Sequence, residues 1–383
     1  MAHHSTVLSQ ILRILPRHEF ETLARRHHRG RKLRSISRWS QFVALTIAQL
    51  TGRSSLRDIV TNLQAQAHKL YHLGSRPVSR SSLARVNEQQ PAGLFEAIFG
   101  RLLSRCQAAA PHHGRRFKAK LYSLDASLID LTLSLFPWAR YQGQKGAIKL
   151  HVGMDHSGHL PAFVHVSEGA RQELQWARTL KLPAGSVVVF DRGFTDYRWW
   201  KSLTEKGIRF VTRLKRGTHY SVQESRNVTW KKNITSDQTI VFNSKRARSL
   251  GLVLRRIGYR DPDTGKHLVF VTNDFKSAAS TIAEVYRQRW QIELFFKWIK
   301  QNLKVKSFLG RSLNAVLSQL WVAMIAYLLL AHLKFHLRLQ WSMSRILRLL
   351  QLNLLERRTL DGLLQEPSPP PDPPVAQTIL AFT

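Results

Sequence analysis

Four side chains that can bind metal ions and phosphate recur at helical spacing late in the chain. Tyr286, Arg289, Glu293 and Lys300 lie in YRQRWQIELFFKWIK, at steps of three, four and seven residues. In one α-helix these steps place all four side chains within about 60° of arc. A carboxylate among a phenol and two cations suits a metal ion next to a phosphate. The same pattern also fits a solvated helix face that carries ion pairs.

A second stripe on the same predicted helix indicates which side is buried. Its members are apolar and recur at heptad-like spacing: Val285, Ile292, Phe296, Ile299 and Leu303. We therefore expect one helix that buries this stripe in a core and turns its polar row towards a cleft.

The charge of the chain favours a polyanionic partner. Lys and Arg number 59 against 24 Asp and Glu in 383 residues, which gives a formal net charge of +35. Double-stranded DNA is the partner we expect, with binding that weakens as salt rises. A membrane surface is the competing partner. We expect no membrane association, because no segment resembles a signal peptide and the longest charge-free run, 312–331, contains polar residues and predicts a buried helix.

The N-terminal 108 residues predict an all-helical DNA-binding domain. Apolar residues recur at helical spacing in five segments: Val7 to Leu15, Phe20 to Leu23, Phe42 to Leu50, Leu56 to Leu63 and Leu94 to Leu103. The turn at Thr51 and Gly52, followed by a helix capped by Ser54, predicts a helix-turn-helix-like pair. The segment SRSSLARVNE predicts another helix, with Arg80 and Arg85 near its first turn, where a groove-reading helix contacts bases.

A cluster of cations in this region predicts a phosphate-binding arm. Six of them fall in one ten-residue window without an acid: Arg25, Arg26, Arg29, Arg31, Lys32 and Arg34. A plain solvated linker is the alternative. The single cysteine, Cys106, excludes an intramolecular disulfide and fits a reducing cytoplasm.

The middle of the chain predicts a mixed α/β sheet. FKAKLYSLD, AIKLHVGMD and LPAFVHVS are strand-like and would form a meander. Helical and strand patterns then alternate, in the order Glu173 to Leu180 (helix), SVVVFD (strand), Asp196 to Lys206 (helix) and IRFVTRL (strand). In such an order a later strand can lie parallel to the first. Residues of about 216–274 read as a β-rich insertion, and 336–383 as helices with a proline-rich tail.

Two aspartates follow strand-like segments and can meet at one sheet edge. Asp125 comes after LYSL and Asp191 after VVVF. If these strands are parallel neighbours, their carboxyl ends lie together, where α/β sheets bind ligands. Each aspartate alone also fits an ordinary turn or cap. With Glu293 they could hold two divalent ions for phosphoryl transfer, and hard oxygen ligands favour Mg²⁺ or Mn²⁺. Asp130 and Asp155 are rival carboxylates.

These motifs together resemble a known family. Asp125 in SLDAS, Asp191 in VVVFDRGFTDY and the Y-x2-R-x3-E-x6-K spacing are similar to DDE transposases of bacterial insertion sequences. The group most similar is the one named for its YREK signature, insertion-sequence family four. The resemblance covers residues of about 110–335. It implies an RNase H-like catalytic core, over residues 109–335, that a β-rich insertion interrupts before the last acidic helix.

The resemblance also implies roles for individual residues. Asp125, Asp191 and Glu293 would be the catalytic metal ligands, and Tyr286, Arg289 and Lys300 would grip the phosphates of the transposon end. Arg213 and Lys215 in TRLK resemble a further phosphate contact. Trp230 in NVTWKK is the nearest candidate for an aromatic that stacks on a flipped base, although an ordinary half-buried strand tryptophan fits as well.

The function expected from these observations is DNA transposition. The protein would bind terminal inverted repeats, cleave DNA with metal-activated water and join the 3′ hydroxyl to target DNA, as a homodimer on DNA in the bacterial cytoplasm near the nucleoid. One alternative is an RNase H-like nuclease that cuts without strand transfer. The other is a DNA-binding relic or repressor without chemistry.

Overall fold

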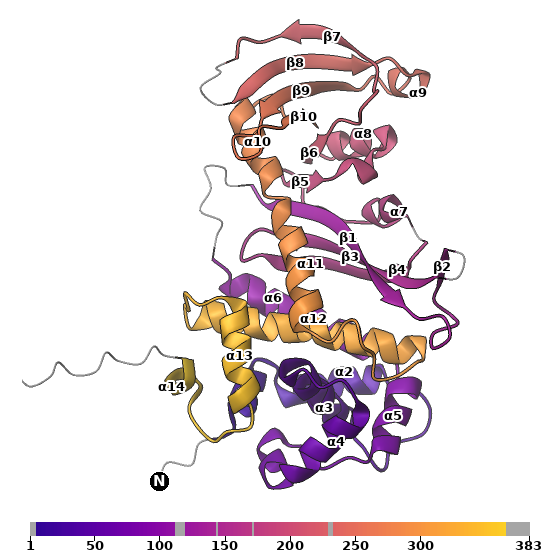
Figure 1. Cartoon of the computed structure of the whole chain (residues 1–383), viewed down its shortest axis with the longest axis vertical. Helices are drawn as coiled ribbons and strands as arrows, with labels where there is room; N and C mark the ends of the chain where they lie inside the picture. The colour runs from indigo at the N-terminus through magenta and orange to yellow at the C-terminus, as the bar shows by residue number, and fades with distance from the viewer. Residues whose placement is uncertain (1–4, 112–118, 143–144, 171, 229–232, 365–383) are drawn as a thin grey trace, which may run out of the picture.

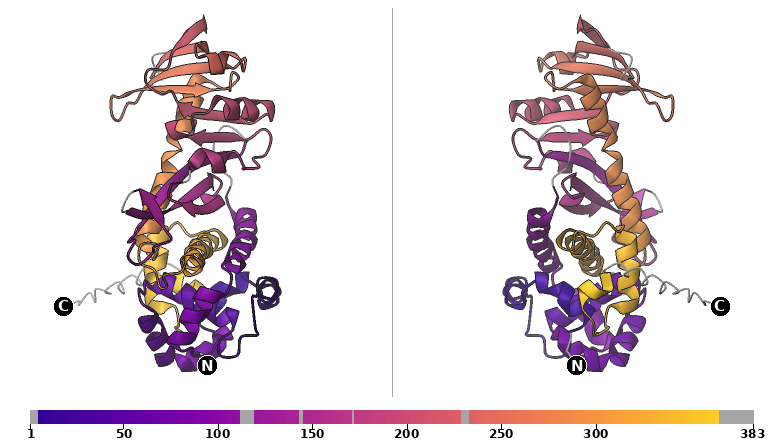
Figure 2. Two further views of the ribbon diagram at one scale, coloured as in Figure 1. Left: turned by 90° about the vertical axis from the view of Figure 1, so that its right-hand side faces the viewer. Right: turned by 90° about the vertical axis from the view of Figure 1, so that its left-hand side faces the viewer.

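The computed structural model describes residues 5–111, 119–142, 145–170, 172–228 and 233–364. The molecule is elongated, with a helical end, a central sheet and a β-rich end (Figures 1 and 2). The column formed by α10 (Ala279–Arg287) and α11 (Trp290–Asn302) runs from the β-rich end to the helical end (Figure 1). This pair of helices therefore extends along the molecule from one end to the other.

In the N-terminal part, the described residues 5–111 form helices joined by turns and contain no strand, as predicted. Its elements are α1 Val7–Ile11, η1 Leu12–Ile14, α2 Arg17–Arg26, α3 Arg38–Thr51, α4 Leu56–Ala65, η2 Ala67–Leu73, α5 Arg80–Gln89 and α6 Gly93–Ala109. Gly52, at φ 70°, ends α3 in the left-handed region, where a side chain would add strain. The predicted cap of α4 was one residue off, because Ser55 rather than Ser54 accepts the bond from the Asp58 amide.

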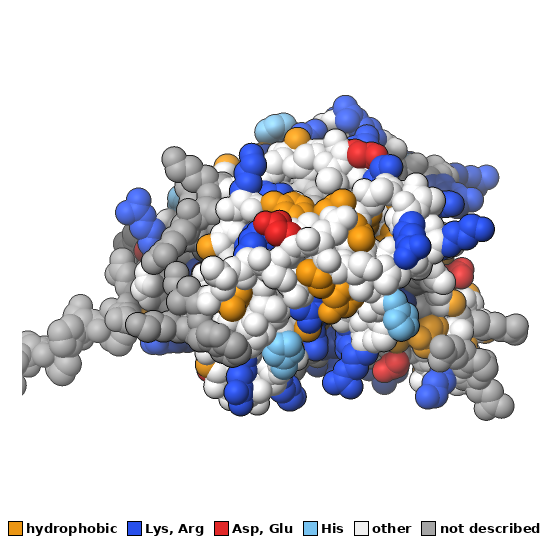
Figure 3. Space-filling view, turned by 90° about the horizontal axis from the view of Figure 1, so that it is seen from above, with side chains coloured by type: hydrophobic (Ala, Val, Ile, Leu, Met, Phe, Trp, Pro, Cys, Tyr) orange, Lys and Arg blue, Asp and Glu red, His pale blue; other side chains and the backbone are white. Residues whose placement is uncertain are grey.

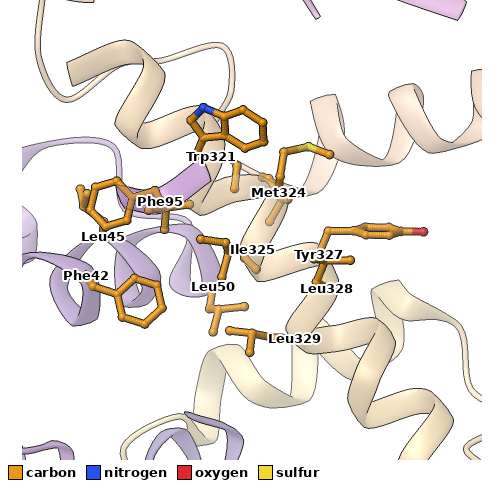
Figure 4. Close-up of a cluster of buried hydrophobic side chains, with 14 of the residues drawn as sticks. Phe42, Leu45, Leu50, Phe95, Trp321, Met324, Ile325, Tyr327, Leu328 and Leu329 are labelled. Carbon is orange, nitrogen blue, oxygen red and sulfur yellow. The ribbon is translucent and has the colours of Figure 1, made fainter. Parts of the chain in front are cut away.

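Helix α12 (Leu313–His336) forms the centre of the helical end. It packs against α3, α5 and α6, with side chains such as Phe42, Phe95 and Ile325 in one apolar cluster (Figure 4). The helix is long and apolar enough to cross a membrane, but 89% of its most apolar window is buried inside the protein. Its apolar surface is therefore accounted for by the core, as predicted. Two more helices follow: α13 Met343–Asn353 and α14 Leu360–Leu364.

A single ten-stranded mixed sheet forms the rest of the molecule. Its strands are β1 Leu121–Leu131, β2 Arg140–Gln142, β3 Lys145–Asp155, β4 Leu160–Glu168, β5 Val187–Phe190, β6 Arg209–Arg213, β7 Tyr220–Ser225, β8 Ile234–Phe242, β9 Val253–Arg260 and β10 His267–Thr272. The order is β2-β3-β1-β5-β6-β10-β9-β8-β7, and β4 pairs with β3. The predicted meander is present, since β3 pairs antiparallel with both β1 and β4.

The region predicted as a β insertion continues this sheet. Strand β10 pairs antiparallel with β6, so β7 to β10 extend the central sheet instead of forming a separate one. Short α-helices lie between the strands from β4 to β9: α7 Glu173–Ala177 before β5, α8 Tyr197–Glu205 before β6 and α9 Lys245–Arg248 before β9. Apolar side chains from α8, β5, β6 and β8 share one cluster, which includes Trp200, Phe190 and Phe242. One continuous sheet thus connects the region around Asp125 to the β-rich end.

Candidate active site

Two aspartates lie side by side on neighbouring parallel strands. Strands β1 and β5 pair in parallel from Leu121 opposite Val187 to Leu124 opposite Phe190. Asp125 and Asp191 are the next residues in this register, so their carboxylates lie at the same place on the sheet, as predicted. One detail of the prediction was wrong, because β1 does not end at Asp125 but continues to Leu131, paired with β3.

The polar stripe does not lie on one continuous helix. Tyr286 ends up in α10, whereas Glu293 and Lys300 lie in α11, and the two helices meet at Gln288 and Arg289. At this junction the Arg289 amide bonds to the Tyr286 carbonyl and the Ile292 amide to the Arg289 carbonyl, three residues back. Such bonds wind the chain more tightly than an α-helix and change the direction of successive side chains.

The apolar stripe explains why the break falls here. All five of its residues are buried, as predicted. Val285 belongs to the apolar cluster of the sheet, but Ile292 and Phe296 belong to the large cluster of the helical end. The helix pair therefore passes from one core to another at the junction, and each half orients its apolar side towards its own core.

Arg289 joins the acidic residues of the site. Its Nη1 lies 3.5 Å from Asp125 Oδ2, and its Nη2 donates a hydrogen bond to Glu293 Oε1. The side chain is 17% exposed, so the two carboxylates face a desolvated cation. This contact brings Glu293 of α11 to the carboxylates of the sheet.

Tyr286 is part of the core as well as of the site. Its ring packs on Phe270 with 4.7 Å between the ring centroids, and the residue is 8% exposed. Burial raises the pKa of the Tyr286 phenol, while Arg289 and Arg213 oppose this shift. The phenol therefore lies beside both guanidinium groups and stays protonated, so that it can donate a hydrogen bond.

The other predicted cations lie at different distances from the acids. Arg213 ends β6 and acts electrostatically on Tyr286, whereas Lys215 is exposed in the following turn. Lys300 lies seven residues after Glu293, about 10 Å along the helix axis. Burial lowers the pKa of Lys300, as does Lys306, while Asp130 opposes the shift. Asp130 therefore lies near enough to Lys300 to act on its charge.

The electrostatics single out Asp125 among the carboxyl groups. Burial raises its pKa to about 7, the Asp191 and Glu173 carboxylates add to the shift, and Arg289 opposes it. Glu173 begins α7, and Lys149 Nζ lies 3.6 Å from its Oε1. Burial and the neighbouring carboxylates thus disfavour the charged form of Asp125, and carboxyl groups with such shifts are typical of functional sites.

The donor set is that of a divalent cation site. Asp125, Asp191 and Glu293 supply the carboxylate oxygens that Mg²⁺ and Mn²⁺ prefer. Among the described residues, however, no group of three or more Asp, Glu, His or Cys side chains is arranged around a common metal position. The positive charge that contacts Asp125 and Glu293 in this arrangement is that of Arg289.

Comparison with known families agrees with this geometry. The family described as "Transposase DDE domain" matches residues 116–329, which include both aspartates and the whole polar stripe. The chain belongs to the DDE transposase family. A second match, to a domain of unknown function, covers residues 3–76 of this transposase-family chain.

The relatives of this chain carry names that describe them as transposases. The chain is 34% identical over 304 residues to "Putative transposase y4zB" of Sinorhizobium fredii, covering 78% of this chain and 82% of the relative. It is 30% identical to "Probable transposase for insertion sequence element IS5377" of Geobacillus stearothermophilus, over 69% and 70% of the two chains. A solved structure of the piggyBac transposase synaptic complex with hairpin DNA aligns at 12% identity and a TM-score of 0.45, covering 95% of this chain and 84% of that one.

The remaining predicted DNA contacts of this transposase-family chain are on the surface. Arg80 and Arg85 on α5 are exposed. So are all six residues of the predicted phosphate-binding arm: Arg25, Arg26, Arg29, Arg31, Lys32 and Arg34. Trp230 lies outside the described residues. Seen from the β-rich end, Lys and Arg side chains surround the rim and few carboxylates are visible (Figure 3). The excess positive charge is therefore present on this face too.

Two residues beside the site, Glu173 and Trp290, were not predicted from the sequence. A Cβ at Gly193 would lie 2.9 Å from Asp191 Oδ1 and 3.5 Å from Glu173 Oε2, so both carboxylates flank this glycine. Trp290 is 57% exposed and lines a cavity of about 810 Å³ with Tyr286 and Arg289. Neither could be selected in advance, because one glutamate in a short helix carries no pattern and a tryptophan in an apolar helix reads as core.

The raised pKa of Asp125 predicts a pH-dependent stability. The pKa is near its ordinary value of 3.8 in the unfolded chain and about 7 in the fold, so stability is lost as pH rises between these values. Without added divalent ions, the free energy of unfolding of Asp125→Asn, relative to that of wild type, should rise by ~2–4 kcal/mol from pH 4 to pH 8. Urea unfolding at a series of pH values measures this gain, and a difference that does not change with pH would contradict it.

Proposed function

We propose that this chain is the transposase of a bacterial insertion sequence of the YREK-signature group. It would bind the terminal inverted repeats of its own element, cleave the DNA there and join the freed 3′ hydroxyl to target DNA. The sheet region would act as an RNase H-like catalytic core, and the helical end as a DNA-binding domain. Similarity to a protein named as a transposase and to two named as transposases for insertion sequence elements supports this proposal.

The observation that carries the proposal is the contact of Arg289 with both acidic elements. It connects Asp125 on β1 to Glu293 on α11, while the β1–β5 register puts Asp191 beside Asp125. Acidic residues that are far apart in the chain thus lie around Arg289, and Tyr286 and Arg213 lie nearby. Carboxylates next to phosphate-binding cations are what phosphoryl transfer on DNA requires.

Each residue has a role that its position supports. Asp125, Asp191 and Glu293 would hold two Mg²⁺ or Mn²⁺ ions. When bound, such ions supply an activated attacking oxygen and stabilise the leaving oxygen. Arg289 and Arg213 would hold phosphate oxygens beside the scissile bond, and the Tyr286 phenol would donate a hydrogen bond there. No covalent link between protein and DNA is needed.

The partners follow from the same reaction. Transposon ends and target DNA are double-stranded, and the net charge of +35 favours both. Because two ends are cleaved together, we propose a homodimer on DNA. The site of action would be the bacterial cytoplasm, at the nucleoid.

A single incubation tests the proposed function. The protein is mixed with Mg²⁺ and a labelled duplex that carries the element's end, taken from the DNA that flanks the gene, together with a target plasmid. We expect cleaved and joined products, separated on denaturing gels. Cleavage without joined products would instead indicate a nuclease, and a shifted but intact duplex would indicate a DNA-binding relic.

A further inference from the structure

One face of α5 carries two arginines separated by small residues. The inner face of this helix, including Leu83, Val86 and Asn87, is buried. The outer face is exposed and holds Arg80, Ser81, Ala84 and Arg85, with Glu88 one turn further on; we call it the α5 face. Small residues between cations allow the helix backbone to approach another surface closely, with a guanidinium on each side.

A cleft adjoins this face at the start of the helix. It has a volume of about 570 Å³ and lies between the first turns of α4 and α5, with Arg57 and Arg80 in its wall. A second hollow of about 290 Å³ adjoins the segment that leads into α5, and Arg34 and Arg76 line it. Among the described ion pairs none involves these four arginines or Arg85, so their charge faces solvent.

One wall of the cleft comes from the segment that follows the helix of the candidate active site in the sequence. This wall contains Phe308 and Leu309, from the segment that directly follows α11. The same segment carries the exposed Lys306, which lies near enough to Lys300 to affect it. Lys300 and Lys306 therefore lie in the stretch of chain between the candidate active site and the wall of the cleft.

We propose that α5 lies in the major groove of the element-end duplex. On the α5 face, Arg80 and Arg85 contact base edges, while Arg34, Arg57 and Arg76 hold the flanking phosphates. A groove about 12 Å wide admits one helix, and arginine is the side chain that most often reads guanine there. Lys306 and Lys300 hold the backbone between this helix and the cleavage site.

This inference rests on the proposed function, and it deepens it. The α5 face would recognise the base sequence, whereas the other cations would bind phosphates of any sequence. The matched domain of unknown function, residues 3–76, would have the role of holding phosphates through Arg34, Arg57 and Arg76. The recognised sequence would lie inside the element at a fixed distance from the cut, because α11 and the following segment connect the two sites.

The test is the binding of two duplexes at several salt concentrations. One duplex carries the element's end, and the other has the same composition in scrambled order; fluorescence anisotropy gives both affinities. Arg57→Ala should weaken both duplexes equally and reduce the log–log salt slope by about one. Arg80→Ala should lower the preference for the end duplex by roughly tenfold. Arg348→Ala, an exposed arginine of α13, is the matched control and should change neither affinity.

A second variant tests the α5 face without removing a contact. Ala84→Glu adds a carboxylate to the middle of the exposed face and suits a helix, so the fold should persist while affinity for the end duplex falls at least ~10-fold. The inference is overturned if Ala84→Glu and Arg80→Ala bind both duplexes as wild type does, or if Arg80→Ala loses affinity for both equally. An end-specific binder that never cleaves would overturn the catalytic proposal and leave the α5 inference intact.

Discussion

Asp125→Asn, Asp191→Asn and Glu293→Gln each lower DNA cleavage by at least ~10³-fold, because metal ions at a phosphoryl-transfer site contribute several kcal/mol to catalysis. Each change removes a charged oxygen ligand at nearly constant shape. Affinity for the end duplex is retained, since removing a negative charge does not weaken contact with phosphates. Cleavage rates with Mg²⁺ and anisotropy binding curves on the same preparations measure the two effects.

The matched control for these variants is Asp130→Asn. Asp130 lies on the same strand as Asp125 but is exposed, and the described ion pairs of Arg289 are with Asp125 and Glu293 instead. Its cleavage rate should stay within a few-fold of wild type. If Asp130→Asn were inactive and Asp125→Asn active, the acidic group would have been assigned to the wrong end of β1. If all three site variants cleaved normally, the chemistry would lie elsewhere.

Asp237→Ala destabilises the fold by about 3–5 kcal/mol, because it leaves a buried arginine without its partner. Asp237 and Arg255 are 6% and 4% exposed, and Arg255 donates to both carboxylate oxygens at 2.8 and 2.6 Å. Arg255 also donates to the carbonyls of Asp274 and Ser277, just before α10. Loss of the pair should therefore also loosen the start of the helix that carries Tyr286.

Urea unfolding followed by tryptophan fluorescence measures this change. The control is Glu21→Ala, which removes the Arg17–Glu21 pair, in which both side chains are 43% exposed. Exposed pairs contribute about 0–1 kcal/mol, so this variant should unfold almost as wild type does. Equal destabilisation by the two changes would mean that the buried Asp237–Arg255 pair contributes no more to stability than an exposed pair does.

Much of the fold follows from local sequence patterns. The apolar spacing of the N-terminal segments predicted helices, and the alternation in AIKLHVGMD predicted a strand of the meander. Turn chemistry was accurate to about one residue, as the cap at Ser55 instead of Ser54 illustrates. These features depend on neighbours in the chain, which is why they can be predicted without a structure.

The break in the polar stripe could not be predicted in the same way. The sequence from Val285 to Leu303 keeps a regular apolar period, which is typical of one helix. The structure divides it at Arg289, because Val285 and Ile292 pack into different cores. Which core receives a side chain depends on residues far away in the sequence, and no local pattern records it.

By itself the sequence determined the chemical groups of the site and their local setting: two aspartates after strand-like segments, a glutamate among cations on a helix, and an excess of positive charge. Only the tertiary structure decided that Asp125 and Asp191 are adjacent in register, that Arg289 joins Asp125 to Glu293, and that Glu173 and Trp290 lie beside them. The reason is physical. Residue type and spacing set local conformation, but the order of parallel strands and the core that each helix joins are set by packing over the whole chain.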